Sequence, residues 1–119
     1  MDAELREPKP YVMFNSLPES DQIPPGPNKV NFLGYRGIPP ASVKNKDEKR
    51  VFILGGSTVF GKPRSLIKNN PTLPQLITKE LNKAGPREIK VFNYGVTSSV
   101  STQDLMRIIL EISDYSPDL

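Results

Sequence analysis

The sequence contains no cysteine and no histidine. The lack of cysteine excludes disulfides and thiolate metal sites, and the lack of histidine excludes imidazole ligands and the usual general base within these 119 residues. We therefore expect neither a metal nor a cofactor in this chain. A sequence without cysteine is compatible with reducing and oxidising compartments alike, so the localisation stays unknown.

Long apolar runs are also missing. No run approaches the roughly 20 residues that a membrane-spanning helix needs. Residues 1–10 are too charged for a signal peptide. We therefore expect a soluble chain without a membrane segment.

A strong excess of one charge is missing as well, since 16 basic residues oppose 13 acidic ones. The basic residues concentrate between Lys44 and Lys68, and a basic stretch can bind phosphate or nucleic acid. However, Asp47 and Glu48 interrupt this stretch, and aromatic residues do not alternate with it. A solvated loop explains the pattern better, so we predict no nucleic-acid partner.

The first 49 residues show little periodicity, and prolines recur in them up to position 40. Because proline interrupts helices, we expect residues 1–49 to form a proline-rich extended segment that lies against a domain. Residues 11–14 and 30–33 could each form a short edge strand within it. The domain itself is predicted at residues 50–119.

Two β-strands are predicted in this domain. Residues 50–54 form an apolar run rich in β-formers that stops at Gly55 and Gly56, as expected for a parallel strand buried on both faces. Residues 89–94 form the second run of this kind.

Two helices alternate with the strands. Thr72 and Gln75 have the spacing of a capping box at the start of the first helix, and Ser101 with Asp104 opens the second. Gly85-Pro86 should end the first helix, and Ser116-Pro117 the second. The apolar stripes expected to face the core are Leu73, Leu76, Ile77 and Leu81, then Leu105, Ile108, Ile109 and Ile112. The order strand, helix, strand, helix predicts neighbouring parallel strands in an α/β domain.

The turn at residues 55–61 lies beyond the carboxyl end of a strand, where open α/β sheets bind ligands. One interpretation is a phosphate-binding loop, because Gly56 to Lys62 matches G-x-x-x-x-G-K. The next position should carry a hydroxyl that ligates magnesium, but it is Pro63. Val59 and Phe60 are also bulky where backbone amides must surround a phosphate. Nucleotide binding therefore ranks below the second interpretation.

The second interpretation is a nucleophile turn that presents Ser57 for acyl transfer, with the Ser57 backbone N–H as an oxyanion donor. Residues 50–61, RVFILGGSTVFG, resemble the first conserved block of SGNH/GDSL hydrolases, although Gly56 stands where familiar members carry Asp. Residues 91–99 resemble the second block. The resemblance extends to residues 31–37, which are similar to a segment before the first strand in some relatives.

The resemblance implies an oxyanion hole made of the nucleophile's N–H, a backbone N–H of the second block and an Asn of a third block. The alignment places the second donor at Ser98, where the family usually has glycine, so we expect a strained backbone there. Gly95 is the alternative donor, and Asn93 is a possible support. Structural roles compete with these: Ser57 as a helix cap, Gly95 as a strand-ending turn and Asn93 as a turn cap.

The fold implied by the resemblance is the flavodoxin-like three-layer α/β sandwich, of which this chain would supply the first two βα units before a missing third strand. The implied activity is hydrolysis or transfer of acyl or acetyl esters of a small molecule or carbohydrate. The family's Asp and His would follow further along the domain, so the 119-residue chain alone should be inactive. The alternative is a non-catalytic SGNH-like binding module.

Overall fold

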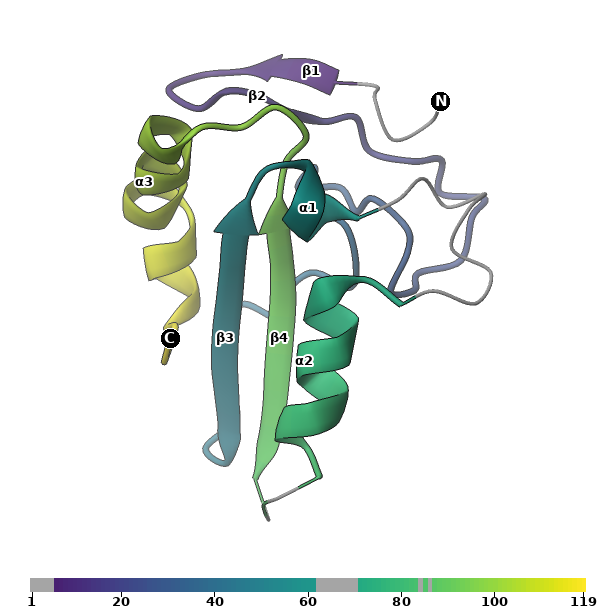
Figure 1. Ribbon diagram of the computed structural model, residues 1–119, viewed down its shortest axis with the longest axis vertical. Coiled ribbons are helices and arrows are strands. Elements are labelled where there is room, and N and C mark those ends of the chain that lie inside the picture. The colour runs from purple at the N-terminus through teal and green to yellow at the C-terminus, as the bar shows by residue number, and fades with distance from the viewer. Residues whose placement is uncertain (1–5, 62–70, 84, 86) are drawn as a thin grey trace.

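The computed structural model describes residues 6–61, 71–83, 85 and 87–119 (Figure 1). These residues form a mixed α/β structure with two small sheets and three α-helices. The strands are β1 (Arg6–Lys9), β2 (Met13–Ser16), β3 (Glu48–Gly55) and β4 (Glu88–Gly95), and the helices are α1 (Ser57–Phe60), α2 (Leu73–Leu81), α3 (Ser101–Leu110) and the short 3-10 helix η3 (Ile112–Tyr115).

The central element is the parallel pair of β3 and β4, which confirms the predicted adjacency of the two strands. Val51 pairs with Val91, and the pairing continues to Gly55 and Gly95 at the carboxyl ends. β3 begins two residues earlier than predicted. Glu48 is buried there in an ion pair with the Arg50 guanidinium, at 2.8 Å, and this partner lets a charged residue lie inside the sheet.

The opposite edge of β3 is also engaged in backbone hydrogen bonds. The Leu119 N–H donates to the Arg50 carbonyl at 3.2 Å, and the Phe52 N–H donates to the Leu119 carbonyl at 2.8 Å. This pattern, in which Leu119 donates to the residue before Val51 and accepts from the residue after it, is that of a parallel β-bridge between Leu119 and Val51. β3 therefore lies between β4 and the segment that contains Leu119.

The core lies on one face of this pair and is mostly aromatic. The two-residue period of a strand places Phe92 and Tyr94 on the same face of β4. Phe52 stacks on Phe92 with ring centroids 4.9 Å apart, and Tyr35 stacks on Tyr94 at 3.8 Å. Val96 and Ile112 complete the buried cluster.

Helix α2 confirms the predicted capping box, because the Thr72 N–H donates to the Gln75 side chain at 2.9 Å. The helix packs along β4 (Figure 1) and ends at Leu81, before Gly85; Pro86 lies outside the described residues. The predicted apolar stripe is only partly buried. Leu73, Leu76 and Leu81 each keep more than a third of their surface exposed.

Helix α3 corrects two predictions. The helix begins at Ser101, as predicted, but its capping pair lies one residue earlier than Ser101 and Asp104: the N-cap is Val100, whose N–H donates to the Gln103 side chain at 2.8 Å. The predicted stripe is also wrong at three of its four positions, because α3 buries Gln103 and Arg107 instead. Polar contacts with the N-terminal hairpin select that face. Of the stripe, only Ile112 is buried, whereas the remaining three residues are exposed: Leu105, Ile108 and Ile109.

The N-terminal segment forms an antiparallel hairpin of β1 and β2, with Lys9 opposite Met13. In Figure 1 the hairpin lies across the end of the molecule toward which β3 and β4 point. The strand predicted at residues 11–14 begins later, at Met13, because Tyr11 lies in the hairpin turn with a positive φ of 66°. Met13, where β2 begins, also has a positive φ, of 68°. Residues 30–33 form turns, with one isolated bridge between Val30 and Arg36.

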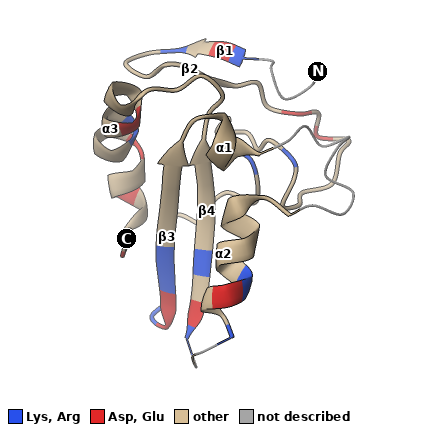
Figure 2. Cartoon of the chain, viewed as in Figure 1, with Lys and Arg blue, Asp and Glu red and all other residues tan. Residues whose placement is uncertain are grey.

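Charged residues of β3 and β4 gather at their amino ends, whereas the carboxyl ends beside α1 are uncharged (Figure 2). Among the described helices, none is long and apolar enough to cross a membrane.

Candidate functional site

The turn after β3 presents Ser57 to solvent. Gly55 has a φ of +154°, and the Gly56 carbonyl accepts the N–H groups of Val59, at 3.1 Å, and Phe60, at 3.0 Å. These bonds close α1 as one helical turn whose first residue is Ser57. Its side chain is exposed, and neither its hydroxyl nor its backbone N–H has a hydrogen-bond partner within the described part of the chain.

Asn93 ties this turn to β4. Its buried side-chain amide donates to the Val59 carbonyl at 3.0 Å and to the Phe60 carbonyl at 3.3 Å. Its side-chain oxygen accepts the Gly95 N–H at 3.0 Å. Asn93 thereby supplies backbone partners that α1, a single turn, does not provide for itself.

Gly95 allows α1 to approach β4 closely. A Cβ atom at this position would lie 2.4 Å from the Phe60 nitrogen and 2.8 Å from the Val59 carbonyl carbon. A side chain there would push α1, and Ser57 with it, away from the sheet. The Gly95 N–H is already donated to Asn93.

The loop at residues 96–100 lies beside the Ser57 turn. The Val96 N–H donates to the Gly55 carbonyl at 3.0 Å, and the Ser99 carbonyl lies 3.6 Å from the position of a Cβ on Gly56. The structure therefore brings the two sequence blocks that carry Ser57 and Ser98 together, as expected from parallel strands that end at the same edge.

Ser98 adopts a φ of 65°, in the left-handed region that favours glycine. The expected backbone strain is therefore present at this position. Ser98 is exposed, and its backbone N–H has no acceptor among the residues that the structure describes. Its hydroxyl accepts a hydrogen bond from the Arg6 guanidinium at 3.2 Å.

Arg6 was not predicted as a site residue. It lies 92 positions before Ser98 in the sequence, and it reaches the loop only because the hairpin folds over this end of the molecule. Its guanidinium also lies 5.2 Å from the centre of the Phe14 ring, which helps to orient it. No local pattern in the sequence signals this placement.

A buried polar cluster holds the 96–100 loop, and it was not predicted either. The Arg107 guanidinium donates to the Ser99 hydroxyl at 2.6 Å and to Asp104 at 3.3 Å. Its other amino group donates to the Phe14 carbonyl at 2.9 Å and to the Asn15 side chain. Arg107 thus connects the hairpin, α3 and the loop that carries Ser98. The signal available in the sequence was the three-residue spacing between Asp104 and Arg107, which makes the two side chains neighbours on a helix.

The rival phosphate-loop interpretation depends on Lys62 and Pro63, and both lie outside the described residues. In the described ranges, no group of three or more acidic residues could hold a metal ion.

A groove of about 620 Å³ runs along α2 and β4, and its lining includes Asn93, Thr72 and Gln75. Ser57 is not among its lining residues. The groove therefore lies beside Asn93, which supports the turn, and not beside the exposed Ser57 hydroxyl.

No protein-family model matches this chain, and no curated protein matches it.

Proposed function

We propose that this chain carries the nucleophile-bearing part of a serine ester hydrolase of the SGNH/GDSL type, with Ser57 as the nucleophile. The observation that carries the proposal is the position of Ser57. Its hydroxyl is exposed and unpartnered among the described residues, beyond the carboxyl end of a parallel strand. Ligands of open α/β sheets bind at this end of the strands.

The strand order supports a flavodoxin-like fold for the domain. In that fold the first strand lies between the second and the third, and all three are parallel. Here β3 lies between β4 and Leu119, and the Leu119 hydrogen bonds have the parallel pattern. Leu119 thus lies at the edge of β3 where a flavodoxin-like sheet has its third strand.

Two backbone donors suit an oxyanion hole in this proposal. The N–H groups of Ser57 and Ser98 have no acceptor within the described residues, whereas the Gly95 N–H is donated to Asn93. This favours Ser98 over Gly95 as the second donor. Asn93 then acts as a support that holds α1, and the Arg6 guanidinium beside Ser98 adds positive charge near a developing oxyanion.

The proposed reaction begins with attack of the Ser57 hydroxyl oxygen on the carbonyl carbon of an acyl or acetyl ester. A base removes the hydroxyl proton, the alcohol leaves with a proton, and the acyl group remains on Ser57 until water or another alcohol accepts it. The chain has no histidine, so the proposal assigns the base to a histidine outside these 119 residues. The substrate is a small-molecule or carbohydrate ester.

The test compares hydrolysis of p-nitrophenyl acetate by the 119-residue chain, by the natural gene product that contains it, and by that product with Ser57→Ala. We expect activity in the gene product and a loss of about a thousandfold or more in Ser57→Ala. We expect no turnover above background in the 119-residue chain. Thr58→Ala, at the exposed neighbouring position of α1, is the matched control and should keep its activity.

Each result has a distinct meaning. Activity that survives Ser57→Ala would remove Ser57 from its role. Robust activity in the short chain would show that the base lies within it. An inactive gene product that still binds an acetylated sugar or acyl ester would favour the non-catalytic binding module.

A further inference from the structure

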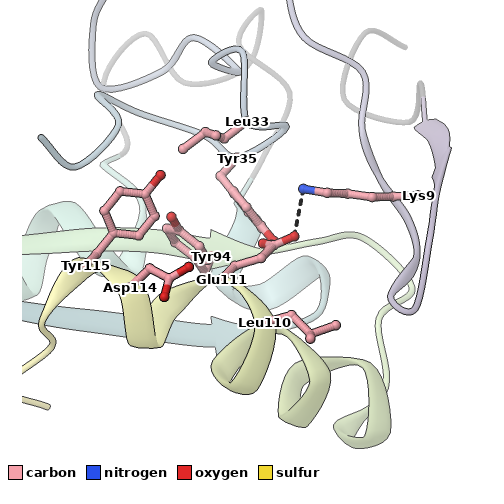
Figure 3. Close-up of a pocket in the computed structure, with 8 residues that line it drawn as sticks. All are labelled: Lys9, Leu33, Tyr35, Tyr94, Leu110, Glu111, Asp114 and Tyr115. Carbon is pink, nitrogen blue, oxygen red and sulfur yellow. Dashed lines mark hydrogen bonds and ion pairs between the residues drawn. The ribbon is translucent and has the colours of Figure 1, made fainter. Parts of the chain in front are cut away.

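Two hollows lie beside β4, and they differ in how their polar groups are paired. In a cavity of about 170 Å³ on the aromatic face, the Lys9 Nζ lies 2.7 Å from one Glu111 carboxylate oxygen and the Tyr35 hydroxyl donates to the other (Figure 3). The larger hollow is the groove of about 620 Å³, whose lining comes mainly from α2, β4 and residues 36–39. In this groove the polar groups without a partner belong to the backbone of β4.

Alternate residues of β4 direct their backbone groups away from β3. Both backbone groups of one strand residue point to the same side, and those of the next residue point to the other side. The Val96 N–H donates to the Gly55 carbonyl, so the even-numbered residues of β4 face β3. Ile89 faces the opposite way, because its N–H and its carbonyl are both bonded to the Asn82 side chain, at 3.0 Å and 2.9 Å. The odd-numbered residues therefore form the second edge of β4.

This second edge is satisfied at its two ends and open in the middle. Asn82 occupies both backbone groups of Ile89, and the Asn93 side chain accepts the Gly95 N–H. Between them, the N–H and carbonyl groups of Val91 and Asn93 have no hydrogen-bond partner among the described residues. Both residues line the groove, and Val91 is partly exposed. Backbone groups without a protein partner need one from a ligand or from water.

We propose that the groove binds an extended peptide of a partner protein, which adds to the sheet as a second neighbour of β4. The peptide backbone pairs with Val91 and Asn93. An extended peptide suits these positions because it presents a donor and an acceptor at every second residue, and this spacing of roughly 6.6 Å is also that of the two positions. The pairing is short, since Asn82 closes the edge at Ile89.

The apolar part of the lining favours apolar side chains at alternate positions of the peptide. Ile38 is 63% exposed, so apolar surface remains for a ligand to cover. The volume of the groove is within the range of ligand pockets, roughly 300–1,000 Å³. The apolar residues of the lining are Ile38, Pro39, Ala41, Pro74, Ile89, Val91 and Phe92, with Pro27.

The charges of the lining favour an acidic residue in the peptide. Arg36 and Lys90 oppose Glu88, which leaves one net positive charge. The Lys90 ammonium lies 3.9 Å from the Glu48 carboxylate, which is already bonded to Arg50 at 2.8 Å. Lys90 is also partly exposed, so it can pair with a carboxylate of the peptide.

This inference goes beyond the proposed ester hydrolysis. The groove does not include Ser57, and the peptide pairs with the backbone of Asn93 and leaves its side chain on α1. Failure of peptide binding therefore leaves the hydrolase proposal unaffected, and loss of the hydrolase proposal leaves the groove intact.

The test is a titration of the ¹⁵N-labelled chain with the peptide acetyl-VEVTV-amide, monitored by NMR at low ionic strength. We expect saturable shifts at Val91 and Asn93. The same peptide N-methylated at its three central residues keeps its side chains but loses its backbone donors, and it should bind about tenfold more weakly or less. Acetyl-VQVTV-amide lacks the acidic residue and should bind several-fold more weakly than the parent.

Two variants probe the groove itself. Val91→Pro removes an N–H that points away from β3, so the β3 ladder is kept, and peptide binding should weaken about tenfold. Ile38→Glu places a negative charge in the lining and should weaken binding of the acidic peptide several-fold. Val43→Glu, at an exposed residue of the same segment outside the lining, is the matched control and should leave binding unchanged.

The spectrum of each variant reports whether the fold is kept, and the N-methylated peptide tests the same contact in the unaltered chain. The proposal is overturned if the parent peptide causes no saturable shift or if the N-methylated peptide binds as well as the parent. Unchanged binding in a folded Val91→Pro variant would also overturn it. Sedimentation at increasing protein concentration provides the remaining arm, because a dimer that Val91→Pro abolishes would assign the edge to a second copy of this chain instead.

Discussion

Two regions of the molecule bury large side chains, and they bury mainly different kinds. Beneath β3 and β4, the buried side chains are aromatic and stack on one another, as Phe52 does on Phe92. Between α3 and the hairpin, the buried side chains are Arg107, Gln103 and Asn15, which are joined to their surroundings by hydrogen bonds. The core is thus stabilised mainly by the packing of apolar rings, whereas the hairpin interface is held mainly by hydrogen bonds.

This difference explains which face of α3 is buried. Burial of its leucine and isoleucine stripe would leave Arg107 in solvent and the Phe14 carbonyl without its Arg107 donor. The structure instead satisfies the Phe14 carbonyl through Arg107 and the Val12 carbonyl through Gln103, and the stripe stays exposed. A polar interface therefore orients a helix whose apolar periodicity indicates the opposite face.

The largest expected effect is in the aromatic core. Phe92→Ala removes a ring that stacks on Phe52, and it should lower the free energy of unfolding by about 3–5 kcal/mol because a cavity remains. Urea unfolding followed by circular dichroism measures this loss. A loss below about 1 kcal/mol would show that the stacked rings are not the principal source of stability.

The corresponding change at the hairpin interface is Arg107→Met, which keeps most of the side-chain volume but leaves the Phe14 carbonyl without its Arg107 donor and Asp104 without its cation. We expect a loss of about 3 kcal/mol, in the range measured when one member of a buried charged pair is removed. Hydrogen exchange should rise first in the hairpin. Lys83→Met, which breaks an exposed pair with Glu80, is the control and should change stability by less than about 1 kcal/mol. Equal effects of the two substitutions would refute the importance of the buried cluster.

A smaller effect is expected where the sheet meets the candidate site. Gly95→Ala places a methyl group against the Phe60 nitrogen, and the displacement of α1 should cost about 1–3 kcal/mol. Gly26→Ala, where nothing lies within 4 Å, is the matched control. If the proposed activity is found, Gly95→Ala should also reduce it, since Ser57 moves with α1. An unchanged unfolding midpoint would show that α1 adapts without strain.

The smallest expected effect is confined to acidic pH. Hydrogen bonds from Lys44 and from the Arg50 backbone N–H hold the pKa of Asp118 at about 2, below its ordinary 3.8. A carboxyl with a lowered pKa in the folded state contributes stability above pH 4, and this contribution is lost as the pH falls toward 2. Unfolding measured from pH 6 to pH 2 should therefore show a shallower acid dependence in Asp118→Asn. Parallel curves for the two proteins would contradict the assignment.

The candidate site was partly predictable from the sequence. The Gly55-Gly56 pair after an apolar run located the turn that exposes Ser57, and the alignment from Asn93 anticipated strain at Ser98, which has a φ of 65°. The close approach that requires Gly95 was not predictable, because it depends on the distance between α1 and β4. The contact of Arg6 with Ser98 depends on a hairpin that folds back across 92 residues. The assignment to the SGNH/GDSL hydrolases stays a prediction.

The sequence by itself determined β3, β4 and α2, because apolar runs that stop at glycine and the Thr72–Gln75 capping box act over a few neighbouring residues. Only the tertiary structure decided the orientation of α3. Helical periodicity shows that a helix has two different faces, but the groups opposite each face determine which one is buried. Here the Phe14 carbonyl accepts a hydrogen bond from Arg107 and the Val12 carbonyl accepts one from Gln103. The cost of burying such polar groups without partners outweighs the gain from covering three apolar side chains.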